Sequence, residues 1–462
     1  MSESIQPTSA AAAADDKLDF KKILPIFVIV LIDLLGLTII IPLLPLYAAA
    51  YGATAFQIGL LGATYPIFQF IGAPILGRLS DRYGRRPVLL VSQVGTLIGF
   101  LILGFAPSLL WVFIARAIDG LSGGNIATAQ AVVTDSTNEK TRTQGLGLIG
   151  AAFGLGFIIG PVIAFLSLAA TGNNYHAPAF VAAGFSVLSI LLTWFWLEES
   201  HPPEKRVQAM QKKSAFSFGA MAEALRHPTI GILLVLIFAQ QIAFGGFEQL
   251  LSLFTLTNLG LGARGNSIVF VYVGIIVVMV QGYFIGKWAR KWGDRRLILL
   301  GLATLTLGMA LMAVTPKVPP PFYSQAEMQQ ELSVARTLPG ETPPTQGVAA
   351  DLPSDANTGW LGLVWLLVAM VPAAIGGGIL QPSINSLITK RVAADERGGI
   401  LGISAAFLSA ANALAPLIGA ALFAAFSPRA PFWFWAALMG VLLVVAIRRV
   451  APDRPAPAPL PA

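Results

Sequence analysis

Residues 77–87 read Gly77-Arg-Leu-Ser-Asp-Arg-Tyr-Gly-Arg-Arg-Pro87, and a related stretch, Gly286-Lys-Trp-Ala-Arg-Lys-Trp-Gly-Asp-Arg-Arg296, begins 209 residues later. Each starts with glycine and a basic residue, continues with a basic residue, an aromatic residue and glycine, and then contains an Arg-Arg pair. Each also lies between two long apolar stretches. The chain therefore repeats a unit of nearly half its own length.

A second pair of landmarks supports the repeat and locates an insertion. Arg142 precedes Pro161 by 19 residues, and Arg397 precedes Pro416 by the same 19, at an offset of 255. Because the two offsets differ by 46, the second half contains an insertion of about that size. The polar, Pro-rich stretch 315–359 fits it, and its composition predicts a flexible outer loop rather than a domain.

The composition excludes a large soluble enzyme. Of the 462 residues, 55% are hydrophobic and only 11% are charged, with a mean hydropathy of +0.73, whereas soluble domains carry roughly 25% charged residues. The chain has no cysteine and three scattered histidines, so we expect no metal site and no cofactor. A polytopic membrane protein is the class that remains.

The apolar runs predict twelve membrane-spanning helices, since each crossing needs about 20 apolar residues. Only helices or closed barrels satisfy the backbone in lipid, so the fold class is all-α. The predicted spans are 23–47, 56–76, 87–104, 109–133, 145–168, 178–197, 229–257, 266–285, 297–314, 360–389, 398–424 and 431–447.

The distribution of Lys and Arg predicts that both termini are cytoplasmic. With that orientation, 25 of the 30 basic residues fall in cytoplasmic segments and 4 in outer loops. The bias accounts for the pI near 9.7 without nucleic acid. The predicted parts are an N-terminal tail 1–22, a six-helix bundle 23–197, a cytoplasmic linker 198–228, a second six-helix bundle 229–447 with the outer loop 315–359, and a Pro-rich tail 448–462.

Four ionisable side chains lie inside predicted spans, where charge is costly in free energy. Asp33 falls near the midplane of the first span, where burial disfavours the carboxylate and favours proton exchange. We predict Asp33, Asp119 and Glu248 as proton-coupling residues. Two alternatives stay open: Asp33 is a permanently paired structural carboxylate, and Arg116 pairs with Asp119 or instead holds Asp33 or an anionic group of a substrate.

Polar and aromatic residues at helical spacing predict a substrate cavity. Gln241, Phe244 and Glu248 form one stripe on the seventh span, which suits either a binding wall or a hydrated outer mouth. Gln281 in the eighth span and Arg116 in the fourth are the other predicted cavity residues, although a lone amide also suits a bond between helices.

The turn at 77–87 predicts a gate on the cytoplasmic side. We expect Asp135 to complete a cluster with Arg85, and Asp81 to face the start of the helix near Gly398, where the helix dipole favours an anion. Topology alone also explains arginines in such a turn. The predicted gating residues are Gly77, Asp81, Arg82, Gly84, Arg85, Arg86 and Asp135.

Small residues in the fifth span predict a pivot between the bundles. Gly156 and Gly160 are four residues apart and allow close helix approach, and Pro161 weakens the helix at one point.

Together these motifs resemble the major facilitator superfamily, most closely its drug:proton antiporters of the tetracycline-pump type. The matching stretches are Asp33-x-x-Gly36-x5-Pro42-x-x-Pro45, the loop 77–87, Arg116-x-x-Asp119-Gly120 and Gly156-x-x-x-Gly160-Pro161. The resemblance implies two bundles around a central pathway and export driven by protons.

The sequence departs from the tetracycline pumps in its buried polar residues. The resemblance implies a buried acid in the third and in the ninth span, but the third has Gly99 at that place and the ninth, 297–314, has no acid. Val277 stands one turn before Gln281 where the resemblance implies a histidine. We therefore expect a substrate other than tetracycline.

These features predict a secondary transporter of the bacterial inner membrane, not an enzyme, that exports small amphipathic organic compounds in exchange for protons. Its expected partners are the substrate, protons and the lipid bilayer, and we expect a monomer. Two alternatives stay open: a metabolite uniporter or symporter on the same fold, and a nontransporting scaffold or receptor that acts through its outer loop.

Overall fold

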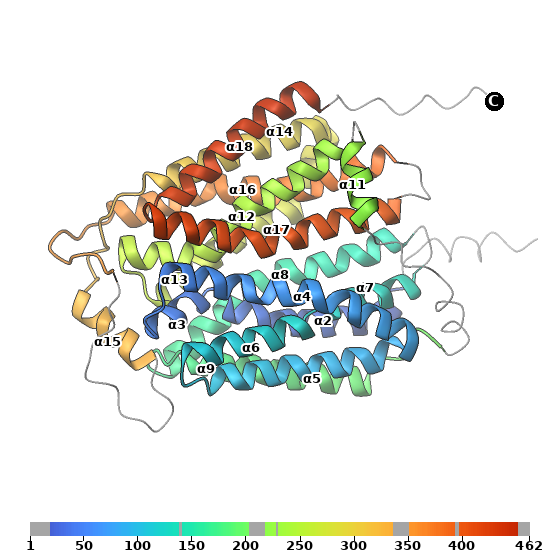
Figure 1. The fold of residues 1–462 in the computed structure, drawn as a ribbon, viewed down its shortest axis with the longest axis horizontal. Coiled ribbons are helices and arrows are strands. Elements are labelled where there is room, and N and C mark those ends of the chain that lie inside the picture. The colour runs from blue at the N-terminus through green and yellow to red at the C-terminus, as the bar shows by residue number, and fades with distance from the viewer. Residues whose placement is uncertain are drawn as a thin grey trace, which may run out of the picture.

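The computed structural model describes residues 19–137, 141–202, 218–227, 230–335, 351–392 and 397–450, and in these ranges all regular structure is helical (Figure 1). The helices are α2 Phe20–Ile40, α3 Leu44–Ala50, α4 Ala55–Tyr83, α5 Arg85–Gly104, α6 Leu109–Ser122, α7 Asn125–Asp135, α8 Arg142–Ala170, α9 His176–Phe195, α11 Phe218–Arg226, α12 Gly231–Leu259, α13 Ala263–Met279, the π-helix η1 Val280–Phe284, α14 Ile285–Ala313, α15 Gln325–Ala335, α16 Leu361–Lys390, α17 Arg397–Ala425 and α18 Ala430–Arg449.

Local signals set several helix ends. Thr54 and Gln57 form a capping box at the start of α4. The Thr54 side chain accepts a hydrogen bond from the Gln57 backbone N–H, and the Gln57 side chain accepts one from the Thr54 backbone N–H. Gly260 ends α12 with a left-handed φ of 64°, which glycine adopts without steric cost.

Ten helical stretches are long and apolar enough to cross a membrane. The predicted span 109–133 is absent from this count because it forms two short helices, α6 and α7, with a break at Gly123 and Gly124. A Cβ on Gly124 would lie only 2.6 Å from the backbone N of Ala73. The close passage of α4 therefore explains why glycines occupy this break.

Two predicted spans, 266–285 and 297–314, appear as one continuous stretch, Ala263–Ala313, of 51 residues. Within it Gly293 has a φ of 76° and a ψ of 162°, which interrupts the helical geometry. The predicted first span, 23–47, is divided into α2 and α3 but counts as a single stretch.

The two halves of the chain repeat the same helix contacts. In the first half α2 packs against α8 and α5 against α9, while in the second half α12 packs against α17 and α14 against α18. Between the halves, α4 packs against α17 and α13 packs against α8. Figure 1 shows the first half below and most of the second half above.

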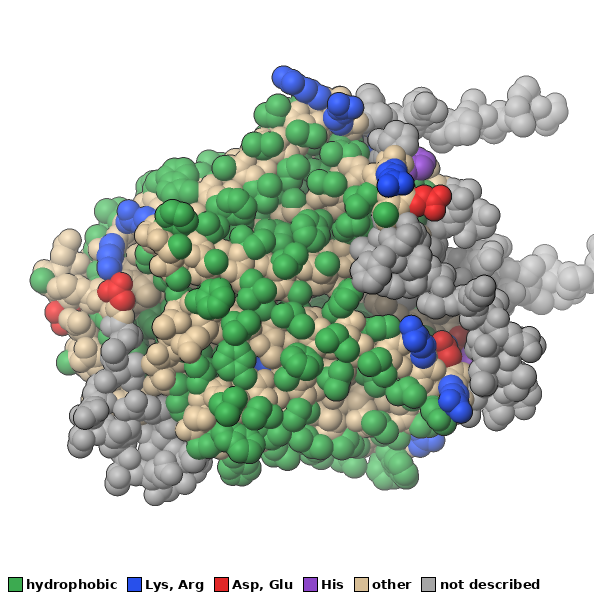
Figure 2. All heavy atoms as spheres, in the orientation of Figure 1, with side chains coloured by type: hydrophobic (Ala, Val, Ile, Leu, Met, Phe, Trp, Pro, Cys, Tyr) green, Lys and Arg blue, Asp and Glu red, His purple; other side chains and the backbone are tan. Residues whose placement is uncertain are grey.

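The sides of the molecule are apolar. Large side chains such as Phe195 and Phe426 are 80% and 77% exposed, and Figure 2 shows hydrophobic side chains over the middle of the face while most charged ones lie toward the two ends. An apolar belt of this kind, together with the ten apolar helices, identifies a multi-pass membrane protein.

The two ends of the bundle differ. One end, here the α15 end, carries α3 and α15, and the other, the α11 end, carries α7 and α11 (Figure 1). The segment predicted as a flexible loop at 315–359 contains the helix α15, which the polar composition did not predict. Parts of the predicted tails, linker and loop lie outside the described residues, namely 1–18, 203–217, 228, 336–350 and 451–462.

Candidate functional site

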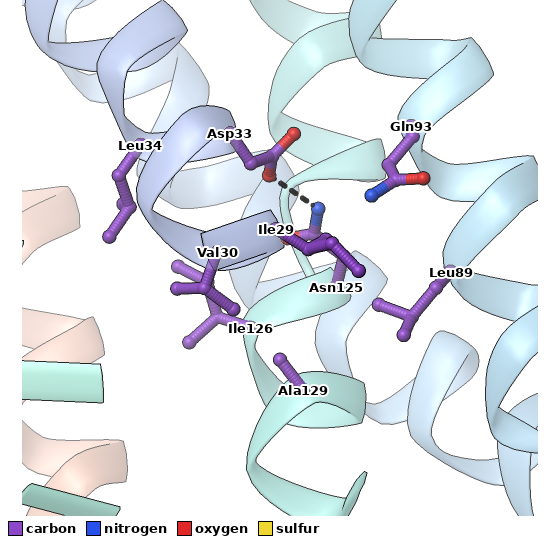
Figure 3. Close-up of a pocket in the computed structure, with 9 residues that line it drawn as sticks. All are labelled: Ile29, Val30, Asp33, Leu34, Leu89, Gln93, Asn125, Ile126 and Ala129. Carbon is purple, nitrogen blue, oxygen red and sulfur yellow. Dashed lines mark hydrogen bonds between the residues drawn. The ribbon is translucent and has the colours of Figure 1, made fainter. Parts of the chain in front are cut away.

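Asp33 projects from α2 into a small pocket within the first half of the chain. Asn125 of α7 donates a hydrogen bond from Nδ2 to Asp33 Oδ2 over 2.7 Å (Figure 3). Asp33 Oδ1 is buried and has no hydrogen-bond partner within the described ranges. The pocket has a volume of about 10 Å³ and is lined by Ile29, Val30, Asp33, Leu34, Leu89, Gln93, Asn125, Ile126 and Ala129.

A buried ion pair lies near this carboxylate. Arg116 Nη1 and Asp119 Oδ2 are 2.6 Å apart, and both side chains are about 5% exposed or less. The Arg116 guanidinium also stacks over the ring of Tyr65 at 4.5 Å, and Thr96 hydrogen-bonds to Asp119. Of the two arrangements expected for Arg116, the structure has the local pair with Asp119. Asp33 instead bonds to Asn125.

Asp33 and Asp119 are close enough to interact electrostatically. The first half therefore brings together two acids, one arginine and several neutral hydrogen-bonding groups on five helices, α2, α4, α5, α6 and α7. Asn125, Tyr65 and Thr96 were not identified from the sequence. Asn125 carried the clearest signal, since it lies in the same predicted span as Arg116 and Asp119.

The predicted stripe on α12 faces other helices of the second half. Gln241 Nε2 donates to Asn412 Oδ1 of α17 over 2.7 Å. The Phe244 ring covers Gly377 of α16, where a Cβ would lie 2.7 Å from the ring Cζ. Glu248 is half-buried on the same helix, with no hydrogen bond or ion pair in the described part of the chain. These residues form a wall separate from Asp33.

Gln281 lies apart from that wall. It is exposed within η1, and no described hydrogen bond joins it to Gln241 or Phe244.

The turn at the α11 end forms the cluster that its sequence predicted. Gly84 has a φ of 106° and a ψ of 159°, a conformation that favours glycine, and it places Arg85 at the start of α5. Arg85 donates from Nη1 to Ser80 Oγ over 2.7 Å and pairs with Asp81 over 2.6 Å. Its Nε pairs with Asp135 Oδ2 over 3.0 Å.

Further contacts secure this turn. Glu199 accepts hydrogen bonds from the backbone N–H groups of Arg85 and Arg86, at 2.9 and 3.2 Å, so a carboxylate caps the N-terminus of α5. The Arg86 side chain donates to the carbonyl oxygens of Thr193 and Trp194 at the end of α9. Glu199 was not predicted from the sequence.

Other gating candidates have fewer partners. Arg82 lies over the ring of Tyr83 at 5.2 Å. A Cβ built on Gly77 would meet no heavy atom of another segment within 4 Å in the described part of the chain. Asp81 is 48% exposed and contacts Arg85. Residues 393–396, which precede the helix start that Asp81 was expected to face, lie outside the described residues, as do the side chains of 397–399.

The second half contains a related cluster. Gly293 repeats the backbone conformation of Gly84. Asp294 accepts hydrogen bonds from Lys390 Nζ at 2.6 Å and Ser386 Oγ at 2.8 Å. Arg295 donates to the carbonyl oxygens of Ile447 and Val450 near the end of α18, as Arg86 does at the end of α9.

The small residues of α8 lie against α2. A Cβ on Gly160 would lie 2.7 Å from Thr38 Cβ, so this glycine permits the close approach of the two helices. A Cβ on Gly156 would meet Thr38 at an ordinary 3.5 Å. Pro161 is inside α8.

The comparisons with known proteins agree with one another. The family model described as Major Facilitator Superfamily matches residues 26–324 and 356–462. "Tetracycline resistance protein, class B" from Escherichia coli is 26% identical over 411 residues, which cover 88% of this chain and 90% of that protein. The class C protein from Escherichia coli is 27% identical over 431 residues, 92% of this chain and 96% of that protein.

Two solved structures show the same fold. The human organic anion transporter MFSD10 (TETRAN) has a TM-score of 0.62 at 21% identity and covers 92% of this chain and 99% of its own. The nucleoside transporter NupG has a TM-score of 0.68 at 12% identity and covers 94% of this chain and 100% of its own.

Proposed function

Because this chain belongs to the Major Facilitator Superfamily of membrane transporters, we propose that it exports small amphipathic organic compounds in exchange for protons by alternating access. Its similarity to tetracycline resistance proteins along about nine-tenths of its length supports export of a drug-like compound. We place it in the bacterial inner membrane as a monomer.

We propose twelve crossings with both termini in the cytoplasm. The 51-residue stretch Ala263–Ala313 is more than twice the about 20 residues that one crossing needs, so it supplies two crossings that divide near Gly293. The helices α6 and α7 together supply another. In the sequence, 25 of the 30 Lys and Arg fall in the tails and connections that twelve crossings assign to one side, and we propose that this side, the α11 end, faces the cytoplasm.

The proposed moving parts are two six-helix bundles, 23–197 and 229–447, joined by the linker 198–228. The repeated contacts of α2 with α8 and of α12 with α17 support this division. The contacts of α4 with α17 and of α13 with α8 are then the joints between the bundles. Gly156, Gly160 and Pro161 lie on α8, which contacts both bundles, and this position suits a pivot.

The α15 end is closed between the bundles. A Cβ on Gly59 of α4 would lie 2.7 Å from the carbonyl oxygen of Pro416 on α17. Toward the α11 end of the same helices, a Cβ on Gly77 or Gly402 would meet no heavy atom of another described segment within 4 Å. This difference supports a cytoplasm-facing state. We propose that Asp81 contacts the start of α17 when the α11 end closes in turn, with Gly77, Arg82, Gly84, Arg85, Arg86 and Asp135 as the rest of the gate.

Asp33 is the proposed main proton carrier. The observation that carries this proposal is a buried carboxylate with one unpartnered oxygen, at the wall of a pocket beside the Arg116–Asp119 pair. A proton taken up from outside neutralises Asp33 and favours outward release of the substrate. Release of that proton to the cytoplasm restores the charge and the affinity. One charge crossing 100 mV supplies about 2.3 kcal/mol.

Asp119 and Glu248 are proposed as further proton-coupling groups. Glu248 is the candidate in the second bundle, where Phe244 and Gln241 lie one and two turns earlier on the same helix. We propose Gln241, Phe244, Gln281 and Arg116 as substrate-cavity residues that contribute hydrogen bonds, an aromatic surface and charge.

Transport by inside-out membrane vesicles tests the proposal. Vesicles from bacteria that express the chain are given an acidic lumen and a panel of amphipathic compounds. We expect at least one compound to accumulate, its addition to make the lumen more alkaline, and a protonophore to abolish both effects.

Other outcomes distinguish the alternatives. Flux that equilibrates regardless of the pH gradient supports a uniporter, and flux in the same direction as the protons supports a symporter. An intact protein that binds a partner through its α15 end, transports no compound of the panel and binds none of them supports a scaffold.

A further inference from the structure

The helix α15, inserted only in the second half of the chain, places one carboxylate between the two halves. Glu331 Oε2 accepts a hydrogen bond from Asn173 Nδ2 over 3.1 Å. Its Oε1 accepts hydrogen bonds from the Tyr175 hydroxyl over 2.9 Å and from the backbone N–H of Ala263 over 3.2 Å. Both carboxylate oxygens are therefore used.

The three donors come from different halves. Asn173 and Tyr175 lie in the turn between α8 and α9, in the first half, whereas Ala263 begins α13, in the second half. Glu331 thus joins two segments that the proposed alternating access must separate at the α15 end.

The surroundings of Glu331 are shaped for this contact. A Cβ on Gly262 would lie 2.9 Å from the Glu331 Cδ, so this glycine lets the carboxylate approach the backbone closely. Asn173 has a φ of 67°, the only positive φ of a non-glycine residue in the described ranges. Such a conformation costs free energy and is retained where contacts enforce it. The backbone of Asn173 is therefore strained in the conformation in which its side-chain amide donates to Glu331.

Tyr175 is held in its donating form. The side chain is 3% exposed, and this burial, followed by the nearby charge of Glu331, raises the pKa of Tyr175 well above its ordinary value. The phenol consequently stays protonated and continues to donate to the carboxylate.

The helix itself is anchored to the hydrophobic core. Leu332 and Met328 are 0% and 8% exposed within it. Tyr323, just before α15, covers Gly260 at the end of α12, and its hydroxyl donates to the carbonyl oxygen of Pro353 over 2.8 Å. On its other side α15 packs against α3 of the first half. Because α15 is anchored, it holds Glu331 in a fixed position against Asn173 and Tyr175, which a loose loop cannot do.

We propose that α15 is a strap that keeps the α15 end closed, and that Glu331 is the residue by which it holds the two halves together. The contact between the two halves does not depend on the proposed function. Only the effect of the strap on transport rests on the proposed alternating access. Opening at this end must break the bonds to Asn173 and Tyr175 while the bond to Ala263 stays within one half. The strap therefore biases the resting protein toward the state that faces the cytoplasm.

The absence of cysteine from the chain makes the strap directly testable. Spin labels are attached to Leu110→Cys at the start of α6 and Phe426→Cys after α17, which are 65% and 77% exposed in the parent chain and lie on different halves. Electron–electron double resonance then reports the distance across the α15 end, without substrate or proton gradient. The variants are Glu331→Ala, Tyr175→Phe and the control Glu327→Ala, an exposed acid of the same helix.

We expect Glu331→Ala to increase the long-distance population about tenfold, since hydrogen bonds to a charged group are lost. Tyr175→Phe should give a smaller increase, and Glu327→Ala should match the parent. Equal distance distributions for Glu331→Ala and Glu327→Ala would overturn the strap. If Glu331→Ala does not fold, Tyr175→Phe decides: an increase supports the strap and an unchanged distribution rejects it. Because no transport is measured, failure of proton coupling leaves this result unaffected.

Discussion

Asp294 of the second half forms a 2.6 Å ion pair with Lys390, at the two positions that correspond to Arg85 and Asp135 of the first half. The first residue of each pair follows a glycine of unusual backbone conformation, Gly293 or Gly84. The second lies at or near the end of the next predicted span, α16 or α7. The repeat has therefore retained the geometry of this ion pair and reversed its charges.

Exchanging the charges of Asp294 and Lys390 should preserve their ion pair. Lys390→Asp leaves the buried Asp294 carboxylate with Ser386 as its remaining described partner, places a second acid beside it and should cost at least about 1–3 kcal/mol of stability. Asp294→Arg alone places two cations together and should cost at least as much. The double variant Asp294→Arg/Lys390→Asp recreates the order found at Arg85 and Asp135. The thermal midpoint in detergent should recover by at least half of the single-variant loss.

The matched control for this exchange is Lys317→Met, since Lys317 lies in the segment before α15 and makes no described ion pair. Its midpoint should equal that of the parent. If the double variant loses as much in thermal midpoint as its two single variants lose together, the Asp294–Lys390 contact depends on more than opposite charge.

Gly160→Ala should destabilise the protein where Gly150→Ala does not. Both glycines lie on α8, but a Cβ at Gly160 would crowd Thr38 of α2, whereas one at Gly150 would meet no heavy atom of another segment within 4 Å among the described residues. Overpacking of this kind typically costs about 1–3 kcal/mol. Thermal unfolding of the two variants side by side measures the difference, and equal midpoints would contradict close packing at Gly160.

The Arg116–Asp119 pair allows stability and transport to be separated. Asp119→Asn leaves a buried guanidinium without its counter-ion and should cost about 3–5 kcal/mol, whereas Arg116→Gln/Asp119→Asn removes both charges and should cost less. Thermal midpoints test this order. If the pair also serves coupling, the stable double variant should still fail in proton-driven export. Wild-type export by that variant would assign the pair to structure alone.

The strap region should tolerate alkaline pH up to a definite limit. Burial and then the charge of Asp355 raise the pKa of Tyr323 to about 12. Because the folded protein holds this proton more tightly than the unfolded chain, the stabilisation is complete below about 10 and is lost as pH rises through about 12. The difference in phenolate absorbance between wild type and Tyr323→Phe should show one group titrating near 12. Titration near 10 would contradict the buried hydroxyl.

Several features of the site could be predicted from the sequence because they follow from spacing. Arg116 and Asp119 are three residues apart on a helix and had to lie on one face. Arg85 lies at the start of one predicted span and Asp135 at the end of the next, so both lie on the same side of the membrane. The family resemblance is confirmed by a match that covers most of the chain.

Other features depended on tertiary contacts that spacing does not reveal. Asn125 could not be predicted as a site residue because an amide in a membrane span costs far less free energy than a charge and is therefore a weaker signal of function. The break at Gly124 follows from the passage of Ala73, which no local pattern encodes. The helix α15 has a polar sequence, and it is the burial of Leu332 and Met328 that holds it in place.

Reconstituted Asp33→Asn protein provides the most direct test of proton coupling. Proteoliposomes containing wild type or the variant are compared in two assays: uphill export driven by a pH gradient, and exchange of labelled for unlabelled substrate without a gradient. Our account predicts that Asp33→Asn abolishes the first and retains the second, since the asparagine still bonds to neighbours but carries no proton through the cycle. Uphill, gradient-driven export by Asp33→Asn at the wild-type rate would contradict it.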